Sequence, residues 1–102
     1  MRSFYRQRFK SAEKLADNAL IKDSINAFTN IYEETDLMEA GYNAAILQEA
    51  LGNLSVAEKM MMEVYERHPD SKVVKGLSDI RYEIGQAERL NKQISSSDPT
   101  DL

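Results

Sequence analysis

The chain of 102 residues has the length of one domain, and its 42% hydrophobic and 29% charged residues are typical of a globular protein. The absence of cysteine excludes disulfide scaffolds, thiolate metal sites and thiol catalysis. The net charge is -4, and the charge is unevenly distributed along the chain. Residues 33–66 carry eight acidic side chains and one basic one, and we call this segment the acidic block. This block disfavours nucleic acid as a ligand and fits either a basic or neutral peptide or a solvated acidic surface.

Apolar residues recur at spacings of three and four along most of the chain, and this period predicts an all-α fold. The first expected helix has an apolar face that includes Phe9 and Ala12, and the face of the second includes Ile25 and Phe28. Few glycines and prolines interrupt the pattern, so we expect long helices joined by short turns. The expected helices span residues 3–18, 22–34, 38–51, 55–67 and 72–93.

Local signals predict where the later helices begin and end. Gly52 follows the third helix and can adopt the left-handed conformation that satisfies the last carbonyl groups of a helix. Ser55, with Glu58 three residues later, predicts a capping box at the start of the fourth helix. Pro69 ends that helix, and the next one is expected to be capped by Asp70 or Ser71.

Residues 38–71 resemble a tetratricopeptide repeat, a motif of about 34 residues that forms two antiparallel helices. The resemblance implies a right-handed stack of helix pairs, in which small residues such as Ala45 and Ala57 lie where helices cross closely. The residues that carry it are Tyr42-Asn43-Ala44-Ala45, Gly52-Asn53-Leu54, Ala57, Met61, Val64 and Pro69. A weaker copy precedes this repeat at the same mutual spacings, and its corresponding residues are Ala12, Ile21, Ser24, Phe28 and Ile31.

Some positions depart from the pattern of the family. Gly41 stands where the family often has a tryptophan or another large apolar residue, and Met61 replaces the usual aromatic residue. In the earlier copy, Ala19 and Asp36 replace the turn glycine and the terminal proline, which makes this copy divergent. We expect one domain over 1–94, formed by a divergent repeat at 4–37, a clear repeat at 38–71 and a capping helix at 72–94, followed by a disordered tail at 95–102.

The last expected helix, 72–93, allows two interpretations. Its apolar residues alternate spacings of four and three, which fits a helix that covers the end of the preceding repeat. The same spacing fits a coiled-coil seam of a homodimer with Asn91 at an inner position, where a single asparagine fixes the register. The residues of this stripe are Val73, Leu77, Ile80, Ile84, Ala87, Asn91 and Ile94.

The resemblance also implies a function, because the first helices of such repeats line a concave surface that binds a peptide or a partner protein. Some members hold a terminal carboxylate with lysine and asparagine, but here no lysine stands beside Asn43 on that face. Alternatively, Tyr42 and Ile46 pack against a neighbouring helix. The residues to which the resemblance assigns partner binding are Tyr42, Asn43, Ile46 and Glu49 in the clear repeat and Phe9 and Glu13 in the divergent one.

No pattern in the sequence predicts catalysis, a cofactor or a metal site. His68 is the only histidine, and its position at a helix end suits an interaction with the last carbonyl groups. The four glycines are scattered singly and form no phosphate-binding loop. We therefore predict a non-catalytic interaction module that binds a protein or a basic peptide and no nucleic acid. The alternative is a structural element that dimerises through 72–94.

Two expectations about location follow from the sequence. Residues 1–10 carry four basic side chains without the apolar core of a signal peptide, and no apolar run approaches the roughly 20 residues of a membrane span, so a complete chain is expected in the cytoplasm without membrane insertion. Those cations lie where the helix dipole disfavours them, which indicates a helix continuing from upstream sequence. The segment from Tyr42 to Leu90 is also similar to the C-terminal repeat region of uncharacterised bacterial cell-envelope proteins. A fragment of such a protein would belong to the cell envelope.

Overall fold

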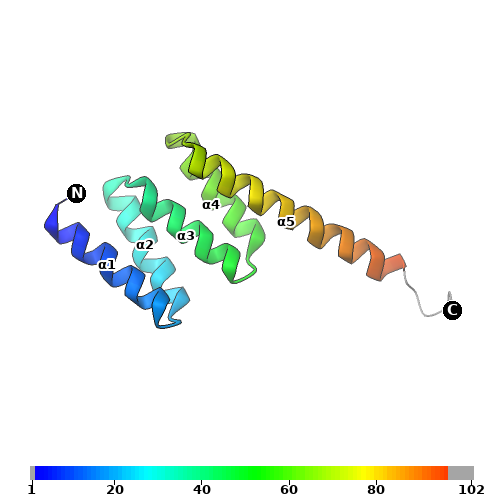
Figure 1. Cartoon of the computed structure of the whole chain (residues 1–102), viewed down its shortest axis with the longest axis horizontal. Helices are drawn as coiled ribbons and strands as arrows, with labels where there is room; N and C mark the ends of the chain where they lie inside the picture. The colour runs from blue at the N-terminus through cyan, green and yellow to red at the C-terminus, as the bar shows by residue number, and fades with distance from the viewer. Residues whose placement is uncertain (1, 97–102) are drawn as a thin grey trace.

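The structure is a computed structural model that describes residues 2–96, which form α-helices joined by short turns and contain no β-strand. Each helix runs antiparallel to the one before it (Figure 1), and α3 contacts α5 as well as its neighbours in sequence. The radius of gyration is 16.7 Å, against about 13 Å for a compact domain of this length, as expected for an open stack. The expected all-α fold of stacked helix pairs is confirmed. The helices are α1 (Ser3–Asp17), α2 (Ile21–Thr35), α3 (Met38–Ala50), α4 (Leu54–Arg67) and α5 (Ser71–Ser96).

The helix ends confirm one predicted cap and correct another. Asp70 caps α5 as expected, because its carboxylate accepts the N–H of Lys72 at 2.8 Å. The predicted capping box at Ser55 is wrong: α4 begins one residue earlier, at Leu54, with Asn53 at the cap position and no side-chain cap. The turn that contains Gly52 leads directly into the helix, so Ser55 already lies within its first turn.

The C-terminal helix is longer than predicted. Ser95 and Ser96, expected in a disordered tail, belong to α5, because the sequence has no glycine or proline between Gly85 and Pro99 to end the helix. The rest of the predicted tail, 97–102, lies outside the described residues.

Burial follows the same pattern in the first and second helix pairs. The small residues at the helix crossings, Ala12 and Ser24 in the first pair and Ala45 and Ala57 in the second, are fully buried. The hydroxyl of Ser24 donates a hydrogen bond of 2.6 Å to the carbonyl oxygen of Ala12, which ties α1 to α2. The larger core residues of the two pairs, at most 2% exposed, are Phe28 and Ile31 and their counterparts Met61 and Val64.

Gly41 lies where α2, α3 and α4 meet. A Cβ atom at Gly41 would lie 2.8 Å from Cγ2 of Val64 and 2.9 Å from Cδ1 of Tyr32, closer than real Cβ contacts. Val64 is itself fully buried and cannot withdraw easily. Tyr32 and Val64 occupy the space beside Gly41, so a larger residue does not fit at this position.

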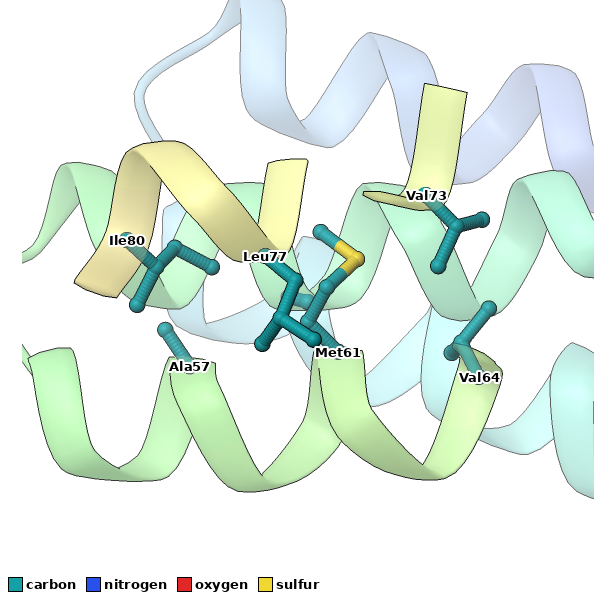
Figure 2. Close-up of a cluster of buried hydrophobic side chains, with 7 residues drawn as sticks. Ala57, Met61, Val64, Val73, Leu77 and Ile80 are labelled. Atoms are coloured by element: carbon teal, nitrogen blue, oxygen red, sulfur yellow. The ribbon is translucent and has the colours of Figure 1, made fainter. Parts of the chain in front are cut away.

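The interface between α4 and α5 forms the larger of the hydrophobic clusters. Figure 2 shows side chains of α5 facing those of α4, and Met61 lies at the centre of this contact. Gly76 allows the close approach, because a Cβ atom there would lie 2.8 Å from Cε of Met61. The residues labelled in the figure are Ala57, Met61, Val64, Val73, Leu77 and Ile80.

The second half of α5 extends past the other helices (Figure 1). The predicted apolar stripe is therefore buried only at its beginning: Val73 and Ile80 are fully buried, whereas Asn91 is exposed and Ile94 is 63% exposed. Leu90, beside the stripe, is 56% exposed. The first three turns of the helix cover α4, and Ile84 in the next turn still packs against the cluster. The apolar residues of α5 beyond Ile84 are exposed.

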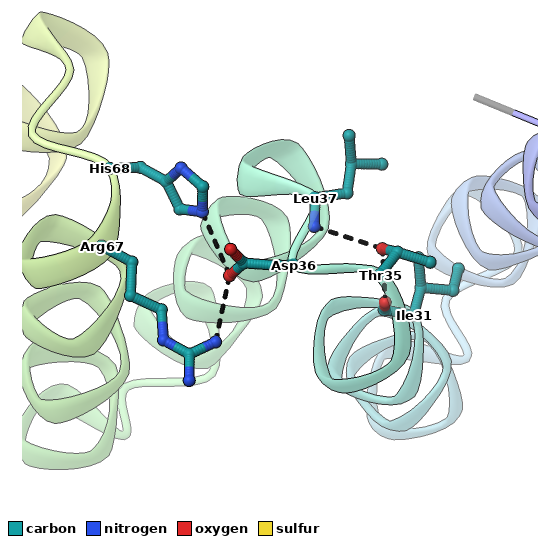
Figure 3. A network of polar contacts seen from close by, with 6 residues as sticks. All are labelled: Ile31, Thr35, Asp36, Leu37, Arg67 and His68. Carbon is teal, nitrogen blue, oxygen red and sulfur yellow. Dashed lines mark hydrogen bonds and ion pairs between the residues drawn. The ribbon is translucent and has the colours of Figure 1, made fainter.

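A polar network joins the turn between α2 and α3 to the end of α4 (Figure 3). One carboxylate oxygen of Asp36 lies 3.0 Å from Nη1 of Arg67 and 3.2 Å from Nε2 of His68. His68 thus contacts a carboxylate from the turn between α2 and α3, not the helix-end carbonyl groups that were expected. The hydrogen bonds from His68 and Arg67 lower the pKa of Asp36 below its usual value. In the same turn, Thr35 donates to the carbonyl of Ile31 at 2.7 Å.

Candidate functional site

A groove between α1 and α3 brings together three of the predicted partner-binding residues, Glu13, Asn43 and Ile46. It encloses about 210 Å³, and Phe28 of α2 contributes to its apolar lining. Asp17 adds a second carboxylate that sequence reasoning missed, although it lies one helical turn after Glu13. Neither carboxylate forms an ion pair with any residue between 2 and 96. The groove thus offers two unneutralised negative charges beside an apolar surface.

Tyr42 lies on a different side of α3, where it faces α5. The ammonium of Lys72 is 4.5 Å from the centroid of the Tyr42 ring and 2.8 Å from a carboxylate oxygen of Glu39. The hydrogen bond to Glu39 raises the pKa of Lys72. A Cβ atom at Gly76 would lie 3.1 Å from the ring, so Tyr42 packs closely against α5. This is the alternative role considered for Tyr42, packing against a neighbouring helix.

Glu49 also faces α5, where it meets Glu83. Burial and a hydrogen bond with Glu83 raise the pKa of Glu49 from its ordinary 4.5 to about 7, and the charge of Asp79 adds to the shift. Two neighbouring carboxyl groups repel each other when both are ionised, and this repulsion adds to the effect of burial in favouring the protonated form of Glu49. Within the described part of the chain, no three acidic, histidine or cysteine side chains are arranged to hold a metal ion.

The remaining predicted residue, Phe9, lies in the core between α1, α2 and α3. Its ring packs edge-on against Phe28, with 5.0 Å between the ring centroids. Phe9 does not line the α1–α3 groove, although it supports Phe28, which does. Ile46 has both environments, because it lines the groove and packs against the cluster between α4 and α5.

A larger groove, which sequence reasoning missed, lies between α2 and α4 and encloses about 690 Å³. Gly41 and Ala44 of α3 lie at its base, and Tyr32 and Met60 belong to its walls. The signal for it was present in the spacing of Gly41 and Ala44, which puts two very small residues on one side of a helix. Only the assembled helices, however, show that α2 and α4 leave a groove above them.

Comparison of the chain with models of protein families, with curated proteins and with solved structures found no match. The class that the fold defines is an all-α stack of helix pairs. The resemblance of residues 38–71 to the tetratricopeptide family stays a prediction from the residues. Over the range that the structure describes, none of the helices combines the length and hydrophobicity required to cross a bilayer.

Proposed function

We propose that this chain is a non-catalytic interaction module of the tetratricopeptide type, which binds a basic peptide or partner protein on the face formed by α1 and α3. The observation that carries the proposal is the groove between these helices, in which Glu13 and Asp17 have no ion-pair partner among the described residues. A lysine or arginine of a partner can meet these carboxylates while an adjacent apolar side chain contacts Ile46. The amide of Asn43, at the same groove, can bond the peptide backbone.

The size of the groove favours a peptide over a small molecule. Its volume of about 210 Å³ is below the roughly 300 Å³ at which pockets begin to enclose a whole small ligand. One or two side chains fit, and the rest of a partner must lie along the surface. Affinity would then come from several such contacts along the stack, as in other helical-repeat proteins.

A peptide-display selection tests the proposal. The full chain is used as bait, and the affinities of enriched peptides are measured by calorimetry at low and high salt. We expect enriched peptides to carry lysine or arginine next to an apolar residue and to bind more weakly at high salt, because exposed charges are screened. Glu13→Lys is expected to weaken binding about tenfold, the equivalent of roughly 1.4 kcal/mol.

Glu88→Lys is the matched control, because it makes the same charge change on the exposed part of α5, away from the groove. The affinity of this variant is expected to stay within about twofold of the unmodified chain, since Glu88 does not line the groove and salt screens charges that lie more than about 8 Å apart. A selection that enriches nothing would contradict the proposal. So would an equal loss of affinity in the two variants, because the groove would then have no special role.

A second candidate function is self-assembly through α5, favoured by the exposure of its projecting half. Leu90 and Ile94 lie one turn apart and are 56% and 63% exposed, and a second copy of the chain could cover both. Sedimentation over a concentration series tests this candidate. We expect a dimer that is lost in the variant Leu90→Lys, and a chain that stays monomeric at every concentration would contradict it.

A further inference from the structure

We propose that the groove between α2 and α4 is a second interaction surface, which binds a lysine- or arginine-bearing segment of a partner protein. This surface is separate from the α1–α3 groove and does not depend on the function proposed above. Two observations support it: the shape and lining of the groove, and the distribution of ion pairs over the acidic block.

The shape of the groove suits a segment of polypeptide. Its volume of about 690 Å³ lies within the range of about 300 to 1,000 Å³ that is typical of ligand-binding sites. Gly41 and Ala44 form a base with almost no side-chain volume, so the space between α2 and α4 stays open. Thr29, Gln48 and Met60, all partly buried, line it and supply both polar and apolar contacts.

Most acidic side chains of residues 33–66 have a partner in the chain, and those of this block that have none among the described residues lie around the α2–α4 groove. Glu49 meets the carboxyl group of Glu83. Four others form ion pairs within the chain: Glu34 with Arg8, Asp36 with Arg67, Glu39 with Lys72, and Glu58 with Arg81. The remaining three, none paired with a described residue, all line the α2–α4 groove: Glu33, Glu63 and Glu66.

This distribution argues for a basic occupant. An acidic surface that serves only solubility has no reason to gather its unpaired carboxylates around one groove. Arg67 also lines the groove, but its guanidinium is held by Asp36 at 3.0 Å and does not neutralise the three glutamates. A cationic side chain that enters the groove therefore meets carboxylates that have no competing partner in the described chain.

Tyr32 adds an aromatic surface to the wall of the groove. Its hydroxyl oxygen is buried, so it is the ring that an occupant can contact. A lysine or arginine side chain can lay its aliphatic stem against such a ring while its charged end meets the carboxylates.

The two grooves lie on opposite sides of α3. A helix turns by about 100° per residue, so Gly41 and Ala44 point away from Asn43 and Ile46. One chain can therefore hold a ligand in each groove at the same time. This separation makes it possible to test the second surface independently of the first.

The test uses a synthetic peptide of alternating lysine and alanine, titrated into the isotopically labelled full chain and followed by NMR. We expect saturable shifts of the Met60 methyl group and of the amides of Thr29 and Gln48, which line the α2–α4 groove. A matched peptide of alternating glutamate and alanine is expected to cause none, because the groove repels it. Equal shifts with both peptides would overturn the charge argument and the proposal.

Two sets of neutral variants separate the surfaces. Replacing Glu33, Glu63 and Glu66 together with glutamine should weaken the affinity that is measured from the Met60 shifts by about tenfold, because it removes all three unpaired carboxylates of the groove. Replacing Glu13 and Asp17 with their amides should leave the shifts at Met60 unchanged. All five side chains are exposed, so both variants are expected to fold.

Other results of the titration would overturn the proposal that the α2–α4 groove binds a basic segment. Shifts confined to the α1–α3 groove, at Glu13 and Asn43, would overturn this inference and leave the proposed function standing. Shifts at Met60 that survive the triple substitution would also overturn it. The absence of any shift on the α2–α4 groove at peptide concentrations in the millimolar range, about the weakest affinity of interest, has the same consequence. In each of these cases the binding proposed for the α1–α3 groove is still tested separately, by the peptide-display selection.

Discussion

Ala19 and Gly52 occupy the same left-handed position in the turns that follow α1 and α3. Their φ angles are 63° and 82°. The N–H of Ala19 donates to the carbonyl three residues earlier at 3.0 Å, and that of Gly52 does so at 2.9 Å. The next residues, Leu20 and Asn53, each donate to the carbonyl five residues earlier, at 2.9 and 3.0 Å. Both turns are therefore the same helix-ending motif, but one of them is built with alanine.

The first prediction concerns this strained alanine. Ala19→Gly is expected to stabilise the chain by about 0.5 to 1 kcal/mol, because the left-handed conformation costs alanine roughly 1 to 2 kcal/mol and the added freedom of glycine in the unfolded state offsets part of the gain. Gly52→Ala should destabilise the chain by a similar amount. Urea unfolding followed by circular dichroism measures both changes.

Ala50→Gly controls for the substitution itself. Ala50 is exposed and is the last residue of α3, where the backbone is right-handed, so glycine should lower stability by up to about 1 kcal/mol. If Ala19→Gly also lowered stability, the left-handed assignment at Ala19 would be wrong.

The second prediction compares two helical glycines. Gly41→Ala should lower the free energy of unfolding by about 1 to 3 kcal/mol, because the new methyl group would overlap Val64 and Tyr32 and overpack the core. Gly85→Ala is the matched control: nothing lies within 4 Å of its Cβ position, so it should raise stability by about 0.5 to 1 kcal/mol through helix propensity. Thermal unfolding of both variants measures the difference, and changes of the same sign would contradict the close crossing at Gly41.

The sequence was sufficient to predict an all-α fold of stacked helices, and particular residues show why. The spacing that relates Ala12 to Ala45 and Phe28 to Met61 reflects a 3.6-residue period, which is a local property of the chain. All four of these residues are buried in the structure, as this spacing leads one to expect. The turn at Ala19 was harder to predict, since alanine gives no sign that it will adopt a positive φ, and only the matching position of Gly52 points to it.

The candidate site was less predictable, because it depends on how helices distant in sequence are placed. Tyr42 and Asn43 are adjacent in the sequence, yet one faces α5 and the other lines the α1–α3 groove. The ion pairs between Glu39 and Lys72 and between Glu58 and Arg81 also join separate helices. Tertiary packing therefore decides which carboxylates stay unpaired. A local sequence pattern does not show this, because the partners lie on helices that are distant in sequence.

The third prediction concerns the three consecutive methionines of α4. Met61 is fully buried between α4 and α5, whereas Met62 is only partly buried. Met61→Ala should cost about 2 to 5 kcal/mol, because it removes transfer free energy and leaves a cavity. Met62→Ala should cost clearly less, and chemical denaturation of the two variants checks the order. Equal losses would contradict the central place of Met61 in the contact between these helices.

The fourth prediction follows from the contact between Glu49 and Glu83. Because the pKa of Glu49 in the folded chain is about 7, against 4.5 ordinarily, the folded chain binds more protons than the unfolded chain between these values. The stability from this proton is fully present below about pH 4.5 and is lost as the pH rises through about 7. Carboxyl NMR titration of Glu49 should therefore show a midpoint near neutrality in the unmodified chain.

Glu83→Gln should remove the charge repulsion from Glu83, so the pKa of Glu49 should fall toward its ordinary value, although burial still raises it. The variant should then lose less stability than the unmodified chain when urea unfolding is compared at about pH 5 and about pH 8, on either side of the shifted pKa. Glu88→Gln, on the exposed end of the same helix, removes an equal charge and should leave the pH dependence unchanged. If Glu49 titrated near 4.5 in the unmodified chain, or if both variants changed the pH dependence equally, the contact with Glu83 would not raise the pKa of Glu49.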